Sequence, residues 1–133
     1  MNKKAFYPTI EKVIEYNLMV LNLIKVKKAD KPEVLSRQKI SEVIEDCKKL
    51  KGDTYDKAVI LLKGLIQKHP FASGNRRTAF IVAKEFVISN NETFKIKDDP
   101  QYARIMIGIR ESYYQDKEIK QWIKDGKIKE FKR

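Results

Sequence analysis

The sequence predicts an all-α fold, a single-domain bundle of about six helices. Apolar residues recur at helical spacing in nearly every segment, and the chain has no internal repeat and no Ser/Gly-rich linker. Its 133 residues, 42% of them hydrophobic, suffice for one core but not for two ordinary domains. We therefore expect one domain over residues 1–133, with its core in 5–125 and a basic C-terminal tail, 126–133, that frays.

Two apolar stripes predict the first two helices. The first stripe comprises Ile10, Val13, Ile14, Leu18, Leu21 and Ile24, and the second comprises Ile40, Val43, Ile44, Cys47 and Leu50. Pro8 and Thr9 precede the first helix, whereas Asp30 is a candidate cap and Pro32 a first-turn residue of the second. Cys47 is the only cysteine, so an internal disulfide and a cysteine metal cluster are excluded, and its place on the stripe predicts a core position.

The third and fourth helices are predicted on either side of a short loop. Gly52 breaks the second helix and Asp53 can cap the third, whose stripe consists of Tyr55, Ala58, Val59, Leu62, Leu65 and Ile66. The same spacing reaches His69, after which Pro70 ends the helix. The pattern resumes with Ala79, Phe80, Ala83 and Val87, so the fourth helix should begin near Asn75 or Arg76.

Turn residues divide the remainder of the chain. Asn90 and Asn91 end the fourth helix, and the alternation that follows predicts at most a short extended segment near 93–97. Asp98 or Asp99, with Pro100, should start a fifth helix, and Asp116 should cap a sixth. Asp125 and Gly126 form a turn signal.

The charge balance favours an anionic partner. Lys and Arg total 29 against 18 acidic residues, for a formal net charge of +11. A nucleotide, a nucleic acid, an acidic protein or a membrane surface would each satisfy this charge. No apolar run is long enough to cross a bilayer and no signal peptide is recognisable, so we expect a cytoplasmic protein that does not insert into a membrane.

The segment from His69 to Arg77 concentrates the chemistry of the chain. It contains the only histidine and precedes a helix N-terminus, where unpaired N–H groups favour an anion. Gly74 would let the backbone approach a ligand, while Asn75, Arg76 and Arg77 offer donors to phosphate. A neutral imidazole opposite a bound phosphate is a general base for an attacking hydroxyl. Taken singly, His69 is also typical of a packing or capping residue, Ser73 and Asn75 are typical helix caps, and Arg76 and Arg77 are typical of a solvated face.

The segment resembles the signature of the Fic/Doc family, His-x-Phe-x-(Asp/Glu/Asn)-(Gly/Ala)-Asn-(Gly/Lys)-Arg. His69, Phe71, Gly74, Asn75 and Arg77 fall on matching positions, and the likeness extends over residues 5–125, closest to the short Doc (death-on-curing) toxins. The resemblance implies that His69 is the catalytic base and that Phe71 anchors the loop. It also implies that the segment from Gly74 to Arg77 holds the phosphates of ATP or another nucleoside triphosphate.

The resemblance also implies the reaction. The adenylylating Fic branch has glycine at the Arg76 position and a second arginine at the Phe80 position, whereas the Doc branch has lysine and no second arginine. This chain is thus closer to Doc, a kinase that moves the γ-phosphate of ATP to a hydroxyl of elongation factor Tu. Transfer of AMP or another nucleotide to a protein hydroxyl is the alternative within the family. A catalytically silent fold that binds nucleic acid or a protein partner is the alternative outside it.

Three further expectations follow from the resemblance. The resemblance implies Mg²⁺ as a cofactor, but at the position of the family's metal-binding carboxylate this chain has Ser73, whose neutral hydroxyl is a much poorer ligand for that ion. Either the phosphates would carry the metal with waters, or Ser73 would serve only as the helix cap. Inhibition would come from a separate antitoxin, because the internal inhibitory pattern is matched only weakly from Ser41 to Glu45. A flap that docks the target protein would lie around residues 50–56.

Overall fold

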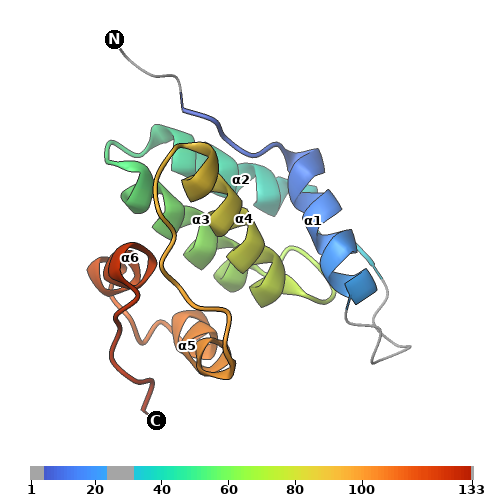
Figure 1. Ribbon diagram of the computed structural model, residues 1–133. Coiled ribbons are helices and arrows are strands. Elements are labelled where there is room, and N and C mark those ends of the chain that lie inside the picture. The colour runs from blue at the N-terminus through green and yellow to red at the C-terminus, as the bar shows by residue number, and fades with distance from the viewer. Residues whose placement is uncertain (1–4, 24–31, 133) are drawn as a thin grey trace.

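The computed structural model describes residues 5–23 and 32–132, and six α-helices account for the regular structure in these ranges (Figure 1). They are α1 (Ile10–Leu23), α2 (Arg37–Lys49), α3 (Thr54–Lys68), α4 (Asn75–Ser89), α5 (Pro100–Arg110) and α6 (Asp116–Asp125). The described part of the chain forms no strand, only an isolated antiparallel bridge between Val34 and Phe71. The predicted all-α, single-bundle fold is confirmed.

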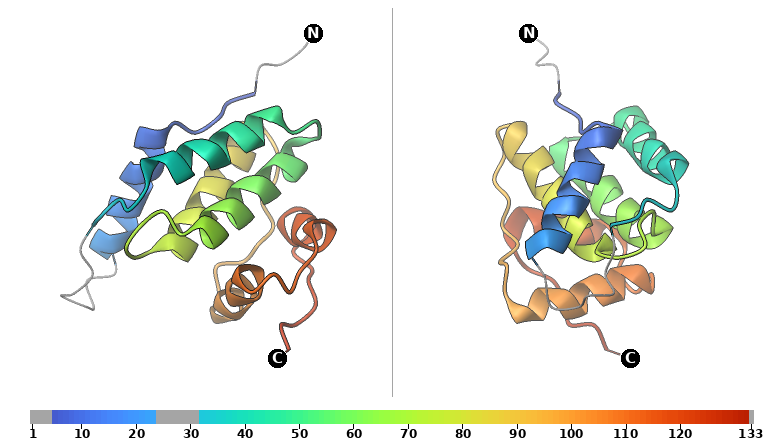
Figure 2. Two further views of the ribbon diagram at one scale, coloured as in Figure 1. Left: turned by 180° about the vertical axis from the view of Figure 1, so that it is seen from behind. Right: turned by 90° about the vertical axis from the view of Figure 1, so that its right-hand side faces the viewer.

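Helix α3 lies at the centre of the bundle. It packs against α2, α4, α5 and α6, while α1 covers α4 and α2 (Figure 1). Viewed from behind, α1 to α4 form one layer and α5 and α6 lie together beneath it (Figure 2). The α3 residues Leu61, Leu62 and Leu65 are at most 1% exposed, and burial of each such side chain favours folding by about 1.5–3 kcal/mol.

Cys47 lies in this core, as its place on the apolar stripe predicted. Its side chain is fully buried, and burial raises the pKa of the thiol to about 12. The nucleophilic thiolate is therefore essentially absent at neutral pH, so Cys47 serves packing rather than chemistry.

Several helix ends follow from the predicted local signals. Asp53 accepts a hydrogen bond from the Asp56 backbone N–H at 2.8 Å, and the Asp56 carboxylate accepts one in return from the Asp53 N–H at 3.0 Å, which completes a capping box for α3. Asp99 caps α5 with Pro100 at its first position, and Gly126 ends α6 in the left-handed conformation. These three ends are set by residues adjacent in the sequence.

The predicted start of the second helix is wrong. Helix α2 begins at Arg37, with Ser36 as its cap, and not near Pro32. The residues before it are extended because Leu35 and Ser36 donate their backbone N–H groups to the carbonyl of Pro70, at 2.8 and 3.1 Å. Asp30, the predicted cap, lies outside the described residues.

The predicted cap of α6 is also shifted by one residue. Gln115 is the cap and donates its N–H to the Glu118 carboxylate at 2.8 Å, while Asp116 is the first helical residue. The Asp116 carboxylate instead accepts a hydrogen bond from Lys63 Nζ at 2.8 Å. This pair ties α6 to α3.

The C-terminal tail packs on the bundle instead of fraying. Phe131 is only 5% exposed, and its carbonyl accepts a hydrogen bond from Arg104 Nε on α5 at 3.1 Å. The Tyr114 hydroxyl donates to the carbonyl of Lys129 at 2.9 Å. The apolar side chain at position 131 thus extends the core beyond the predicted limit at residue 125.

The segment between α4 and α5 is extended, as predicted for residues 93–97, but no described strand pairs with it. The Tyr55 hydroxyl donates to the carbonyl of Thr93 at 2.7 Å, and Lys95 donates its N–H to the carbonyl of Ile123 at 2.9 Å. The segment therefore crosses the bundle held by α3 and α6. None of the described helices is both long and apolar enough to cross a bilayer.

Candidate functional site

The loop between α3 and α4 is held by the extended segment that precedes α2. The Pro70 carbonyl accepts the hydrogen bonds from Leu35 and Ser36, and Ala72 donates its N–H to the carbonyl of Glu33 at 3.0 Å. Residues 33–36 therefore lie beside the loop. Residues 50–56, where a flap was expected, lie at the opposite end of α3 (Figure 1), so that expectation is wrong.

Asn75 closes the loop from within. Its amide Nδ2 donates to the Phe71 carbonyl at 2.8 Å, and its Oδ1 accepts the Phe71 N–H at 2.9 Å. Both residues are buried, at 5% exposure for Asn75 and 1% for Phe71, which is the position expected of a loop anchor. The Asn75 amide was expected to contact phosphate, but it is engaged with this backbone, so what Asn75 can offer an anion is its own N–H at the start of α4.

Gly74 allows the loop to approach α1. Its φ of 78° lies in the left-handed region, and a Cβ built there would be 3.2 Å from Asn17 Nδ2 and 3.3 Å from Leu21 Cδ2. Asn17, which is 2% exposed, donates to the Ser73 carbonyl at 2.9 Å and to Thr78 Oγ1 at 3.1 Å. The glycine thus allows the contact with α1, and because it also lines a cavity its approach to a ligand stays a prediction. Gly74 is also the N-cap of α4, so neither Ser73 nor Asn75 is its cap.

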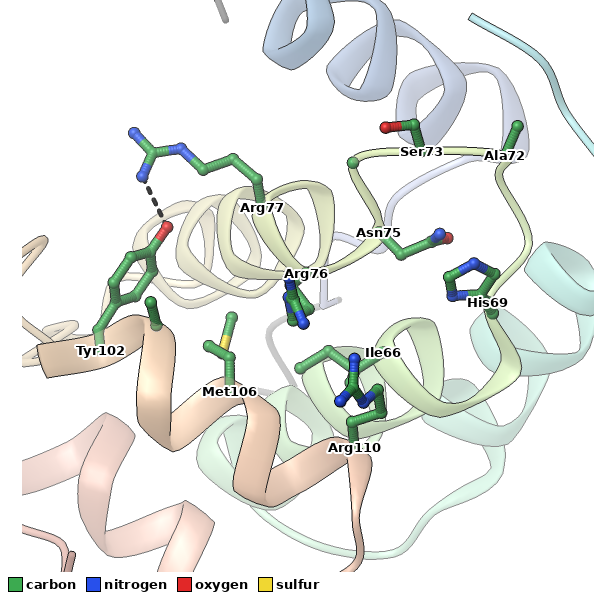
Figure 3. A pocket seen from close by; sticks show the side chains of 12 residues that line it. Ile66, His69, Ala72, Ser73, Asn75, Arg76, Arg77, Tyr102, Met106 and Arg110 are labelled. Atoms are coloured by element: carbon green, nitrogen blue, oxygen red, sulfur yellow. Dashed lines mark hydrogen bonds between the residues drawn. The ribbon is translucent and has the colours of Figure 1, made fainter. Parts of the chain in front are cut away.

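His69 is the C-cap of α3 and is exposed. Its φ of 52° and ψ of 58° are left-handed, an uncommon conformation for a residue other than glycine. It lines a cavity of about 430 Å³ that also reaches Arg76 and Arg77 at the start of α4. Figure 3 shows the imidazole on one wall and the Arg76 side chain in the gap between α4 and α5. The imidazole forms no hydrogen bond with any residue that the structure describes, so it is available to a ligand.

Arg76 and Arg77 differ in their surroundings. Arg76 is exposed and forms no ion pair within the described ranges. Arg77 turns away from His69 (Figure 3), where its guanidinium donates to the Tyr102 hydroxyl at 2.6 Å and to Asp98 at 3.1 and 3.3 Å. The hydrogen bond to Tyr102 and then the carboxylate of Asp98 raise the pKa of Arg77. Its charge is already partly balanced, unlike that of Arg76.

A comparison with protein families matches a range of the chain that includes the loop identified by the sequence signature. The Fic/DOC family model matches residues 25–87, which span α2, α3, the loop and most of α4. This match supports assignment of the chain to the Fic/Doc family. A search of curated proteins finds no match. Fic/Doc membership implies a transferase role, by AMPylation or phosphorylation, and proteins of this family often act on protein targets and together with antitoxins.

One wall of the Fic/Doc cavity comes from a helix that lies outside the matched range. Tyr102, Ala103, Met106 and Arg110 of α5 line the cavity, and none was predicted as a site residue. Tyr102, Met106 and Arg110 are spaced by four residues and therefore share one helix face. This spacing was visible in the sequence, but nothing local indicated that the face turns toward His69.

The described lining does not fit the Mg²⁺ that the Fic/Doc resemblance implies. It contains no Asp or Glu, and Ser73 offers only a hydroxyl and a carbonyl that already accepts from Asn17. No group of three or more His, Cys, Asp or Glu residues that could hold a metal occurs in the described part of the chain. Protein sites for Mg²⁺ ordinarily use at least one carboxylate. The charged side chains that line this cavity are instead the positive arginines Arg76, Arg77 and Arg110.

Proposed function

We propose that this protein is a kinase that transfers the γ-phosphate of ATP to a hydroxyl of a target protein, such as elongation factor Tu. His69 acts as general base, Arg76 and the N–H of Asn75 at the start of α4 hold the phosphates, and Gly74 and Arg77 line the same cavity. The observation that carries the proposal is the shared cavity: an imidazole and an arginine, both without partners among the described residues, face one space beside the N-terminus of α4.

The proposed step uses groups that line this cavity. The imidazole of His69 removes the proton of the target hydroxyl while the hydroxyl oxygen forms a bond to the γ-phosphorus. The bond between that phosphorus and the β,γ-bridging oxygen breaks, and ADP leaves with the electron pair. Arg76 and the free N–H groups of α4 stabilise the charge on the phosphoryl oxygens, the usual source of catalysis in phosphoryl transfer.

The environment of Phe80 supports phosphate transfer over nucleotide transfer. The adenylylating branch of the family has an arginine at this position. In this chain the residue is a buried phenylalanine, which is 3% exposed. Its ring packs edge-on against Phe94 and Tyr102, with centroids 5.4 and 4.8 Å away. No cation can occupy this position without unpacking the contact between α4 and α5.

Two labels of ATP test the reaction. Incubation with cell extract or purified elongation factor Tu should transfer ³²P to protein from the γ-position and not from the α-position. Label from the α-position would instead establish nucleotidyl transfer. Transfer from neither position would contradict both reactions and leave a binding protein, for which steep salt dependence of nucleic-acid affinity is the positive test.

His69→Asn tests the base without backbone strain. Asparagine adopts the left-handed conformation of His69 more readily than alanine does, so the fold should be retained. The rate should fall by about 10²- to 10⁴-fold, the usual contribution of a positioned general base. Lys84→Ala, on the exposed part of α4, is the control and should leave the rate unchanged. A His69→Asn rate equal to that of the wild type would exclude His69 as the base.

A further inference from the structure

Two arginines from different helices converge on the candidate cavity. Arg76 extends from the first turn of α4, and Arg110 extends from the last turn of α5. Figure 3 shows both side chains directed into the space between the two helices, with His69 on the adjacent wall. The residues are 34 positions apart in the sequence, so the packing of α5 beneath α3 and α4 brings them to one cavity.

The two guanidinium groups lack an acidic partner inside the cavity. Arg110 is 45% exposed, and its ion pair is with its neighbour Glu111, at 3.4 Å, which does not line the cavity. Arg76 has no ion pair among the described residues, and the described lining contains no carboxylate. Two like charges that face one space repel each other unless an anion lies between them.

We infer that Arg76 and Arg110 clamp the polyphosphate of the nucleotide and supply the positive charge that a metal ion supplies elsewhere in the family. This inference rests on the proposed function, whose site it describes. Guanidinium groups suit the role because each presents several donors in a plane, which matches the oxygens of a phosphate. A metal ion would need a carboxylate ligand, which is missing at Ser73, whereas the charge of an arginine needs no such ligand.

Arg77 is poorly placed for the same role. Its guanidinium is held by Asp98 and Tyr102, so a phosphate would have to compete with a carboxylate already in contact. Arg110 has no such competitor within the cavity lining. Helix α5, which lies outside the matched range of the family model, therefore contributes a phosphate-binding residue.

The test is the affinity of full-length protein for inorganic tripolyphosphate, measured by calorimetry in excess EDTA. The wild type should bind, and Arg110→Ala should weaken binding by about 10- to 100-fold, the effect of losing a charge-assisted hydrogen bond. Lys84→Ala removes the same charge from an exposed site on α4 outside the cavity and should change affinity by less than about 2-fold. Because Arg110 is half-exposed, its replacement should leave the thermal transition unchanged.

Three results would overturn the inference. They are no binding of tripolyphosphate in EDTA, binding that appears only when Mg²⁺ is added, and equal affinity of Arg110→Ala and the wild type. Failure of the proposed kinase reaction gives a different result: tripolyphosphate binds and depends on Arg110, but no label from γ-³²P-ATP reaches protein. The two hypotheses are therefore separable with the same variants.

Discussion

Replacement of Asn75 by alanine should destabilise the protein although the residue belongs to the candidate site. The amide of Asn75 is the hydrogen-bond partner of both the N–H and the carbonyl of Phe71, at 2.9 and 2.8 Å. Alanine removes both partners at once. The backbone groups of Phe71 would then be buried without hydrogen bonds, since the Phe71 side chain is only 1% exposed.

The magnitude follows from the two orphaned groups. A buried backbone group left without a partner costs about 1–3 kcal/mol, so the pair costs about 2–6 kcal/mol. We expect about 2–4 kcal/mol, because the adjacent cavity lets water reach part of the loop. For a chain of this length the loss corresponds to a decrease in Tm of about 10 °C.

Urea unfolding followed by circular dichroism measures this loss. Lys84→Ala, an exposed substitution on the same helix, should shift the free energy of unfolding by less than about 0.5 kcal/mol. The reasoning would be refuted by a stable Asn75→Ala variant, within 0.5 kcal/mol of the wild type, that binds ATP poorly. That pattern would mean that the amide contacts phosphate and does not hold the loop.

Two further substitutions test the loop of the site and the opposite end of α3. Gly74→Ala should cost about 1–3 kcal/mol in thermal unfolding, because φ is positive and the added Cβ would lie 3.2 Å from Asn17 Nδ2; an unchanged Tm would contradict this. The hydrogen bond from Lys120 lowers the pKa of Asp56. Because the folded pKa lies below the unfolded one, this stabilisation is complete above the unfolded pKa and is lost as the pH falls through the folded pKa. Lys120→Met should therefore flatten the acid side of a Tm profile, and parallel profiles for the two proteins would exclude the pair.

The helix ends show which part of the fold could be predicted. Asp53 and Asp99 cap their helices through contacts within three residues, so the local sequence contains the whole signal. The start of α2 could not be found in this way. Pro32 favours a helix start, but the hydrogen bonds from Leu35 and Ser36 to Pro70 keep the preceding segment extended. A contact between segments 35 residues apart has no local signature.

In the candidate site, the sequence predicted which residues take part but not the direction in which their side chains point. The signature identified the loop and its histidine, yet neighbouring arginines on a helix point about 100° apart, so they cannot both face one ligand in the same way. Arg76 faces the cavity, whereas Arg77 faces Asp98, which lies beyond α4 in the sequence. Arg110 reaches the cavity from α5, beyond the residues that the family model matches. Because the direction of each arginine depends on a segment distant in the sequence, the charges that act on a phosphate follow from the packing of α5 as much as from the signature itself.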